Sequence, residues 1–234
     1  MARSSALGRL LRLRPQVDPM LGQRLHALSE VRPPPIRRSH RMNRYVTVDV
    51  ETTGIDLNKD RVISIGAVAL TQGQVDFADC FEVVLRQPES SRTENILVHQ
   101  IGGQQQLAGA DPAESLVRFL EYVRLCPLVA FRSEFDQTML DRELTEVLGL
   151  RTQSMWIDLA KLMPALYPSN DCRTMEDWLD RFGIKMVARH DALADALATA
   201  QMLQVILAAA DKVGMDCPAK LDEMQRAQQW LGKR

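Results

Sequence analysis

Two carboxylates, Asp49 and Glu51, stand two residues apart at the end of an apolar stretch of the chain. In a β-strand, successive side chains point to opposite faces, so both acids lie on one face and the alternate valines of residues 46–50 lie on the other. Neighbouring carboxylates repel each other unless a cation lies between them, and oxygen ligands suit a hard ion such as Mg²⁺ or Mn²⁺. The pair therefore indicates a metal site. A strand that simply ends in the polar turn Thr52-Thr53-Gly54 is the alternative on these residues alone.

A histidine and a third acid mark the start of a long alanine-rich helix, predicted over residues 191–212. If Asp191 caps this helix, His190 lies just outside it and Asp195 lies in its opening turns. The helix is kept thin by five small residues, Ala192, Ala194, Ala196, Ala198 and Ala200. A thin helix can approach a sheet closely, which would bring Asp195 to the first two acids. An ordinary amphipathic helix with a solvated Asp195 is the alternative, but it leaves the histidine at the helix mouth unexplained.

A fourth acid, Asp136, stands three residues after Ser133, which we expect to cap a helix that runs to Leu148 and stops at Gly149. A carboxylate in the first turn is favoured by the helix dipole. A plain capping box, with Asp in the place of Glu, explains the same residues. Asp136 is therefore a candidate site residue only in combination with the other acids.

The predicted elements alternate in a way that fits a mixed sheet covered by helices, an α/β architecture. After the opening strand, strands are predicted at residues 61–70, 75–86, 128–131 and 156–159, and a turn at Gln72-Gly73 joins the second to the third. Helices are predicted to start at Asp111 and Thr174 as well as at Ser133 and Asp191, while residues 87–109 are expected to form a long loop.

Composition bounds the remaining possibilities. A chain of 234 residues that is 46% apolar can form one domain with a substantial core and an extension. The four cysteines lie far apart and form no CxxC pair, which favours reduced thiols and a cytoplasmic location over a disulfide framework or a zinc site. We expect no membrane partner, because no stretch reads as long and apolar enough to cross a bilayer.

The N-terminal residues differ from the rest of the chain in charge. Residues 1–44 hold ten arginines against two acids, a balance of +8, and the remainder carries −9, which together give the net −1. The triplet Pro33-Pro34-Pro35 favours an extended linker. The leucines and arginines of residues 7–28 predict a short basic helix that docks on the body or on a phosphate backbone. A solvated tail and an organelle-targeting peptide are the alternatives. We therefore divide the chain into an Arg/Pro-rich extension (1–43), a central domain (44–213) and a C-terminal helical tail (214–234).

Three motifs in order carry a resemblance to a known family: DVETTG at residues 49–54, Phe-Asp at 135–136 near a helix start, and HxxxxDA at 190–196. Together they resemble the DEDDh group of 3′–5′ exonucleases, the family of polymerase proofreading subunits, over about residues 44–212. The resemblance implies a ribonuclease H-like fold with a five-stranded mixed sheet whose second strand is antiparallel to the rest. It also places the family's acids and histidine on five positions, Asp49, Glu51, Asp136, Asp195 and His190.

The same resemblance implies two divalent cations, Mg²⁺ or Mn²⁺, that act on a phosphodiester. Asp49 is then the ligand shared by both ions, with Glu51 and Asp195 on the first ion and Asp136 on the second, while His190 is the general base. We expect the turn Thr52-Thr53-Gly54-Ile55 to form the lip of a pocket for the 3′ end, so these four residues are predicted to bind substrate.

Two departures from the family pattern lie near the expected cleft. The residues before the second motif read Phe131-Arg132-Ser133-Glu134, where the family has smaller polar groups, and His99-Gln100-Ile101 stands in place of His-Gly-Ile. His99 and Arg132 are accordingly predicted to contact substrate. For Arg132, a phosphate contact and an ion pair with Glu134 both remain open.

These observations predict a 3′–5′ exonuclease that releases nucleoside 5′-monophosphates from single-stranded or frayed DNA 3′ ends, with a DNA polymerase as a partner. An RNA-trimming or oligoribonucleotide nuclease of the same fold is one alternative, since no residue reveals recognition of a 2′-hydroxyl. An inactive nucleic-acid-binding or polymerase-docking module is another. The presence of all five catalytic positions argues against that module, because binding alone does not need them.

Overall fold

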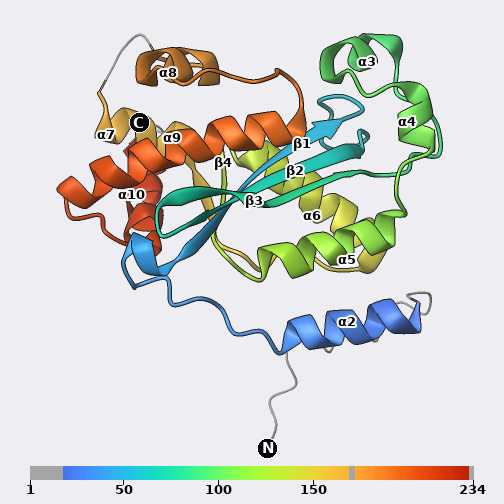
Figure 1. The fold of residues 1–234 in the computed structure, drawn as a ribbon, viewed down its shortest axis with the longest axis horizontal. Helices are drawn as coiled ribbons and strands as arrows, with labels where there is room; N and C mark the ends of the chain where they lie inside the picture. Colours follow the sequence, from blue (N-terminus) through green and yellow to red (C-terminus); the bar gives the residue numbers. More distant parts are fainter. Residues whose placement is uncertain (1–17, 169–171, 232–234) are drawn as a thin grey trace, which may run out of the picture.

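The computed structural model describes residues 18–168 and 172–231, and within them a five-stranded sheet forms the centre of the fold (Figure 1). The strand order is β3-β2-β1-β4-β5. Only β2 runs against the others, because it pairs antiparallel with β1 and β3 while β1, β4 and β5 pair in parallel. The predicted mixed sheet is confirmed. The strands are β1 (Arg44–Thr52), β2 (Val62–Thr71), β3 (Gln74–Val84), β4 (Leu128–Ala130) and β5 (Trp156–Asp158).

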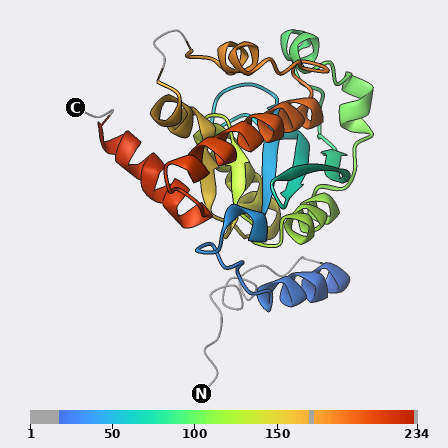
Figure 2. The same cartoon turned by 60° about the vertical axis from the view of Figure 1, so that its left-hand side comes forward.

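The alternation of side chains along β1 separates two hydrophobic cores. The valines at 46, 48 and 50 pack with α5 (Pro112–Val123) and α6 (Glu134–Leu148) on one face. On the opposite face Tyr45 packs with a second group of helices, and α9 lies across the sheet there (Figures 1 and 2). That group consists of α7 (Leu159–Leu166), α8 (Met175–Phe182), α9 (Ala192–Lys212) and α10 (Pro218–Leu231). Residues 47, 49 and 51 of β1 therefore face α9.

The predicted hairpin between β2 and β3 is present. Gln72 and Gly73 both adopt positive φ, 57° and 76°. Two consecutive left-handed residues are the signature of the type I′ turn, whose twist matches that of the strands it connects.

The prediction of a loop over residues 87–109 was wrong, because this stretch contains α3 (Thr93–His99) and α4 (Gly103–Leu107). Helices of seven and five residues are too short to show a periodic pattern or to form alone, so tertiary contacts stabilise them. The buried amide of Gln106 supplies several of these contacts: it donates to Ile101 O and Ser91 Oγ and accepts from Ser91 N.

Two predicted boundaries also need correction. Leu159 was assigned to the last strand, but it begins α7, and Asp158 caps that helix by accepting a hydrogen bond from Ala160 N at 3.0 Å. Ser133 was expected to cap α6, but it has helical backbone angles and its side chain makes no capping hydrogen bond. The turn before α6 is instead fixed by Asp158, whose Oδ1 accepts from Arg132 N at 3.0 Å. A contact 26 residues away along the chain leaves no local signal.

Part of the N-terminal extension packs on the body. α2 (Pro19–Ser29) lies against α5 on the side away from the sheet (Figures 1 and 2). Leu25 is fully buried there, and Arg24 donates two hydrogen bonds to each of Glu114 and Glu121. The solvated-tail alternative is therefore wrong for residues 18–30, and the rest of the predicted basic helix, residues 7–17, lies outside the described residues.

The C-terminal helix α10 covers the outer edge of the sheet. The amide of Gln225 donates to Trp156 O at 2.9 Å and accepts from Asp158 N at 2.8 Å, so it pairs with β5 as a neighbouring strand would. The segment before α10 also meets the N-terminal extension, where His40 N donates to Asp216 O. The division of the chain at residues 43 and 213 stays a prediction.

Among the described residues, one helix, α9, is long and apolar enough to cross a membrane by length and composition, which the sequence analysis did not expect. Half of its apolar window is buried within the fold. Core helices of soluble proteins have the same composition, and the buried face of α9 packs on β1 and β2.

Candidate metal centre

The approach of α9 to β1 depends on a glycine in the neighbouring strand. Gly66 of β2 stands directly opposite Asp49, and a Cβ at this position would lie 2.1 Å from the carbonyl carbon of Ala192. The hydroxyl of Thr47 anchors the helix one turn later by donating to Ala196 O at 2.8 Å. The sequence analysis identified the small alanines of the helix but missed Gly66. A glycine inside an otherwise apolar strand was the available signal.

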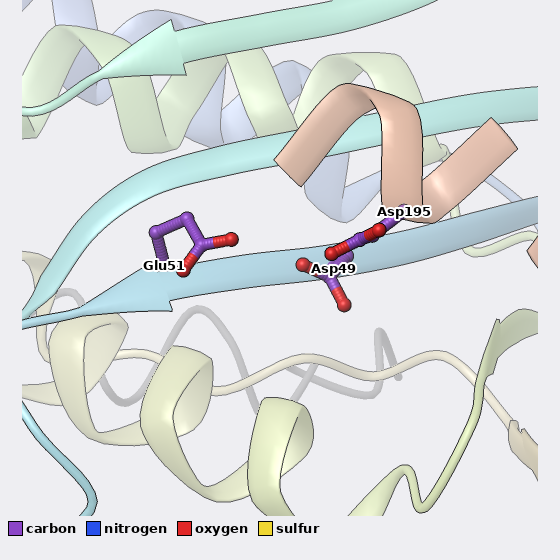
Figure 3. A group of neighbouring side chains, drawn as sticks. All are labelled: Asp49, Glu51 and Asp195. Atoms are coloured by element: carbon purple, nitrogen blue, oxygen red, sulfur yellow. The ribbon is translucent and has the colours of Figure 1, made fainter. Parts of the chain in front are cut away.

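Three of the predicted acids meet where α9 begins. Ligand oxygens of Asp49, Glu51 and Asp195 all lie within 4.8 Å of one another, and their side chains share the space between β1 and α9 (Figure 3). Asp195 Oδ2 accepts a hydrogen bond from His190 N at 3.2 Å, whereas Oδ1 is buried and has no hydrogen-bond partner in the described residues. A buried carboxylate oxygen without a donor beside two further carboxylates fits a hard divalent cation.

Asp136 comes from the opposite layer of the fold. It lies in the first turn of α6, is only 6% exposed and does not belong to the three-carboxylate group. Among the neighbouring acids, Asp136 nevertheless has the largest effect on Asp49, because its charge raises the pKa of Asp49 more than the charge of Asp195 or Glu51 does. Asp136 therefore lies beside the group, where it can contribute to a second ion.

The acids are held in an environment that disfavours their charge. Burial, followed by repulsion from Asp136 and Asp195, raises the pKa of Asp49 well above its usual range. Burial and the neighbouring acids raise the pKa of Glu51 to about 8, and burial raises the pKa of Asp136 to about 7 and that of Asp195 to about 6. Without ions, the cluster therefore retains protons at neutral pH, and a divalent cation can replace them.

His190 stands at the mouth of α9, as predicted. Asp191 caps the helix by accepting from Ala194 N at 2.8 Å, and His190 precedes it with a left-handed backbone, φ 56°. The histidine lines a cavity of about 320 Å³ between α9, the strands β2 and β3, and the turn after α3. The other residues that line it include Ser64, Glu82, His99 and Arg189. Ser64 pairs with Glu51 across the sheet, so the cavity adjoins the carboxylates.

The turn after β1 is rigid and presents an apolar side chain. Thr53 Oγ1 donates to Asp60 Oδ1 at 2.8 Å, and Thr52 Oγ1 donates to Gly54 O at 2.6 Å. A Cβ at Gly54 would lie 2.5 Å from Asp60 Oδ2, so a larger residue there would displace the Asp60 carboxylate. Ile55 is 89% exposed. The predicted lip is thus braced by Asp60, a residue that the sequence analysis missed, and Ile55 is free to meet a ligand.

His99 is buried and has protein partners on both ring nitrogens. Nδ1 accepts from Ile101 N at 3.0 Å, which places the proton on Nε2, 3.4 Å from Ser91 Oγ. The next residue, Gln100, caps α3 in the left-handed conformation, φ 58°, which glycine adopts most readily. The structure thereby explains the position at which the resembled family has glycine. His99 contributes its ring to the cavity wall and braces this turn.

The guanidinium of Arg132 contacts the backbone and not Glu134, while its predicted phosphate contact stays a prediction. The backbone of Arg132 is left-handed, φ 60°, and its guanidinium donates to Arg173 O at 3.0 Å rather than pairing with Glu134. The residue that orders this turn is Asp158, which is 4% exposed and whose charge also raises the pKa of Asp136. Sequence analysis missed Asp158, although an acid between a strand and an apolar segment is a cap signal.

Comparison with known proteins agrees with this geometry. The family described as Exonuclease matches residues 46–203. The PolC-type DNA polymerase III of Thermotoga maritima is 26% identical over 182 residues, which cover 78% of this chain and 13% of the polymerase. The PolC-type enzyme of Clostridium perfringens is 29% identical over 163 residues, 68% of this chain and 11% of that protein. The chain thus spans only a small part of the length of these relatives.

Two solved structures share the fold. E. coli exonuclease I in complex with a dT13 oligonucleotide superposes with a TM-score of 0.62 at 18% identity, covering 73% of this chain and 42% of that one. Exonuclease X in complex with 5′-overhanging duplex DNA gives a TM-score of 0.59 at 16% identity, covering 77% of this chain and 99% of that one. The predicted ribonuclease H-like fold is confirmed.

Proposed function

The chain belongs to the exonuclease family, and from this premise we propose that it removes nucleoside 5′-monophosphates from the 3′ ends of single-stranded or frayed DNA. The observation that carries the proposal is the carboxylate group of Asp49, Glu51 and Asp195, with Asp136 beside it. Four acids kept together in spite of their repulsion match the requirement of a two-ion phosphodiesterase site.

Each acid has a proposed role that its place in the fold supports. Asp49 is the acid that the charges of the other three all affect, and it would be the ligand common to two divalent cations, Mg²⁺ or Mn²⁺. Glu51 and Asp195 complete the first ion's set, and Asp136, which comes from the opposite layer, serves the second. When bound, such ions neutralise charge on the phosphoryl oxygens and lower the pKa of water.

His190 is the proposed general base, which takes the proton from the attacking water. An imidazole accepts a proton near neutral pH. The link from His190 N to Asp195 Oδ2 holds this residue next to the carboxylates, and the histidine lines the adjoining cavity. The rigid turn at residues 52–55 then forms the lip that receives the 3′ end, where Ile55 offers an apolar surface to a base.

The substrate and partner proposals draw on the relatives. Exonuclease I and exonuclease X were solved with a dT13 oligonucleotide and with overhanging duplex DNA, which supports a DNA end as the substrate here. The matching relatives are DNA polymerases, which supports a polymerase partner. Cys80, Cys126 and Cys217 are free thiols in the part of the chain that the structure describes, and this supports the proposed cytoplasmic location.

The deciding experiment incubates the full chain with matched 5′-labelled DNA and RNA oligonucleotides in Mg²⁺, Mn²⁺, Ca²⁺ or chelator. We expect a ladder of products shortened from the 3′ end with DNA, and release of nucleoside 5′-monophosphates. Ca²⁺ should permit binding with little turnover, because its larger and looser coordination suits the two-ion geometry poorly. Preference for RNA would favour the trimming alternative, and full activity in chelator would contradict the metal site.

A further inference from the structure

One arginine beside the candidate metal centre has no role in the mechanism above. Arg189 immediately precedes His190 in the segment that runs from α8 and turns into α9 beside the tip of β1 (Figures 1 and 2). It lines the same cavity as His190. A guanidinium therefore lies close to the space in which the phosphodiester must bind.

The remaining charges of this cavity make a cation necessary for an anionic substrate. Glu82 of β3 and Asp191 at the start of α9 also line it, so two carboxylates border the space that a phosphate would enter. Arg189 is the residue in that lining with a permanent positive charge. Without Arg189, the two carboxylates of the cavity lining would repel the phosphates of a nucleic-acid strand.

Arg189 is held by a partner that it can leave. Its guanidinium donates to Glu176 at the start of α8, in an ion pair whose side chains are 59% and 47% exposed. Ion pairs this exposed are weak, because water screens the charges and both side chains lose conformational freedom. A phosphate, by contrast, accepts bidentate charge-assisted hydrogen bonds from a guanidinium.

Glu176 remains stabilised after Arg189 departs. The largest cause that lowers the pKa of Glu176 is its own backbone N–H in the first turn of α8, and the side chain of Thr174 contributes before Arg189 does. The carboxylate can therefore stay charged at the helix N-terminus without the arginine. Exchange of the ion pair for a phosphate contact leaves neither group buried and unpaired.

We propose that Arg189 is a phosphate-binding residue of this site, which rests on Glu176 in the free protein and moves to a phosphate oxygen of the strand when substrate binds. This inference rests on the proposed nuclease function and adds a specific contact with the polyanion. Glu176 then competes with the substrate for the guanidinium. The two residues consequently have opposite effects on affinity, even though they are partners in the free protein.

The test measures KM and kcat of the full chain on a 5′-labelled single-stranded oligonucleotide in Mg²⁺. Arg189→Ala should raise KM about tenfold or more, because a charge-assisted contact is lost, with a smaller change in kcat. Glu176→Gln should lower KM by about twofold to fivefold, because the competing charge is gone while the side chain keeps its size. Arg189→Lys should be intermediate, since it keeps the charge and loses the bidentate geometry.

A second readout does not require turnover. It is the binding of a fluorescent oligonucleotide in chelator, measured by anisotropy over a range of salt concentrations. The salt slope, that of the logarithm of the association constant against the logarithm of the salt concentration, should be about 0.7 less steep in Arg189→Ala, because one phosphate contact on a single strand is lost. Arg226→Ala is the control, because it removes an exposed arginine that is also ion-paired and lies on α10, outside the cavity lining. This control should leave KM and the salt slope unchanged.

The outcomes separate the possibilities. If Arg189→Ala and Glu176→Gln lower kcat alike and leave KM and the salt slope unchanged, the ion pair only holds the segment that carries His190. The inference is then overturned. Parental values in Arg189→Ala overturn it as well, while cleavage by the parent keeps the proposed function intact. An inactive parent would contradict the proposed function, and the anisotropy measurement still decides whether Arg189 binds the strand.

Discussion

Gly66 stands directly across the sheet from Asp49, and the backbone of Ala192 occupies the space that any side chain at Gly66 would need. This contact sets how near the first turn of α9 comes to β1. Asp195 lies on that turn, so the distance between the helix acid and the strand acids depends on the missing side chain of β2. The candidate metal centre thus depends on a glycine that contributes no ligand.

Gly66→Ala should therefore damage the site and the fold together. The new Cβ would meet backbone atoms of Ala192 and Leu193, which cannot move without shifting α9. We expect a loss of about 1–3 kcal/mol in the free energy of unfolding, typical of overpacking, and loss of cleavage. Thermal unfolding and activity with Mg²⁺ measure both effects.

Gly22→Ala is the matched control for this prediction. Gly22 lies within α2 and has nothing within 4 Å of the position of an added Cβ. The substitution should be neutral or should stabilise the protein by up to about 1 kcal/mol, because alanine favours a helix more than glycine does. If Gly66→Ala behaved in the same way, the close approach of α9 would not be needed.

The raised pKa values of the acids predict how stability depends on pH. The folded, metal-free chain keeps protons on Glu51 and Asp136, with pKa about 8 and about 7, where the unfolded chain has already lost them. Because the folded state binds more protons between about pH 4 and pH 8, these groups make stability fall as pH rises through that window. The melting temperature in chelator should be lower at pH 8 than at pH 5.5.

Asp49→Asn tests the cause of this pH dependence. Asn is neutral without binding a proton, so the substitution should raise the melting temperature of the metal-free protein at pH 8, flatten its dependence on pH and abolish cleavage. Mg²⁺ should raise the melting temperature of the parent more at pH 8 than at pH 5.5, and that of the variant little at either pH. Identical slopes for parent and variant would place the pH dependence outside the metal centre.

The features of the fold that could be predicted from the sequence are those determined by residues close together in the chain. The alternation along β1, the turn at Gln72-Gly73 and the cap at Asp191 act over a few residues, and all were predicted correctly. The helices α3, α4 and α7 were missed because they are short and are stabilised by distant contacts.

The candidate site divides in the same way. Residue types and strand faces placed Asp49 and Glu51 on the side that α9 covers. The sequence analysis missed the residues that brace the site: Asp158 orders the turn that contains Arg132 from another strand, and Asp60 accepts from Thr53 Oγ1 in the turn after β1. The guanidinium of Arg132 reaches Arg173 O, 41 residues away along the chain, and its contact with a phosphate stays a prediction.

The docking of α2 changes what the N-terminal arginines can do. Arg24 is engaged with Glu114 and Glu121, so it is not available for a phosphate backbone. Arg24→Ala should lower the free energy of unfolding by about 1 kcal/mol or more, because it leaves two carboxylates on α5 unpaired. Turnover of a dinucleotide should not change. The control is Glu30→Gln, which changes an acid just past the end of the same helix. A parental melting temperature for Arg24→Ala would show that the ion pairs of Arg24 with Glu114 and Glu121 do not stabilise the fold.

His190 offers the most direct test of the chemistry. Its backbone is left-handed and its N–H is bonded to Asp195, so a replacement should tolerate that conformation. Asn does so more readily than most residues, which makes His190→Asn the preferred variant and His190→Ala the second.

Without a base, turnover should fall about 10²–10⁴-fold, while binding of Mn²⁺, measured by calorimetry, persists because no ligand is removed. At saturating Mg²⁺ the rate of the parent should fall towards acid pH, because imidazolium cannot accept the proton, and both variants should lack that limb. A variant that keeps the acid limb and loses thermal stability instead would make His190 a structural cap for α9, and the proton acceptor would then have to lie among the carboxylates.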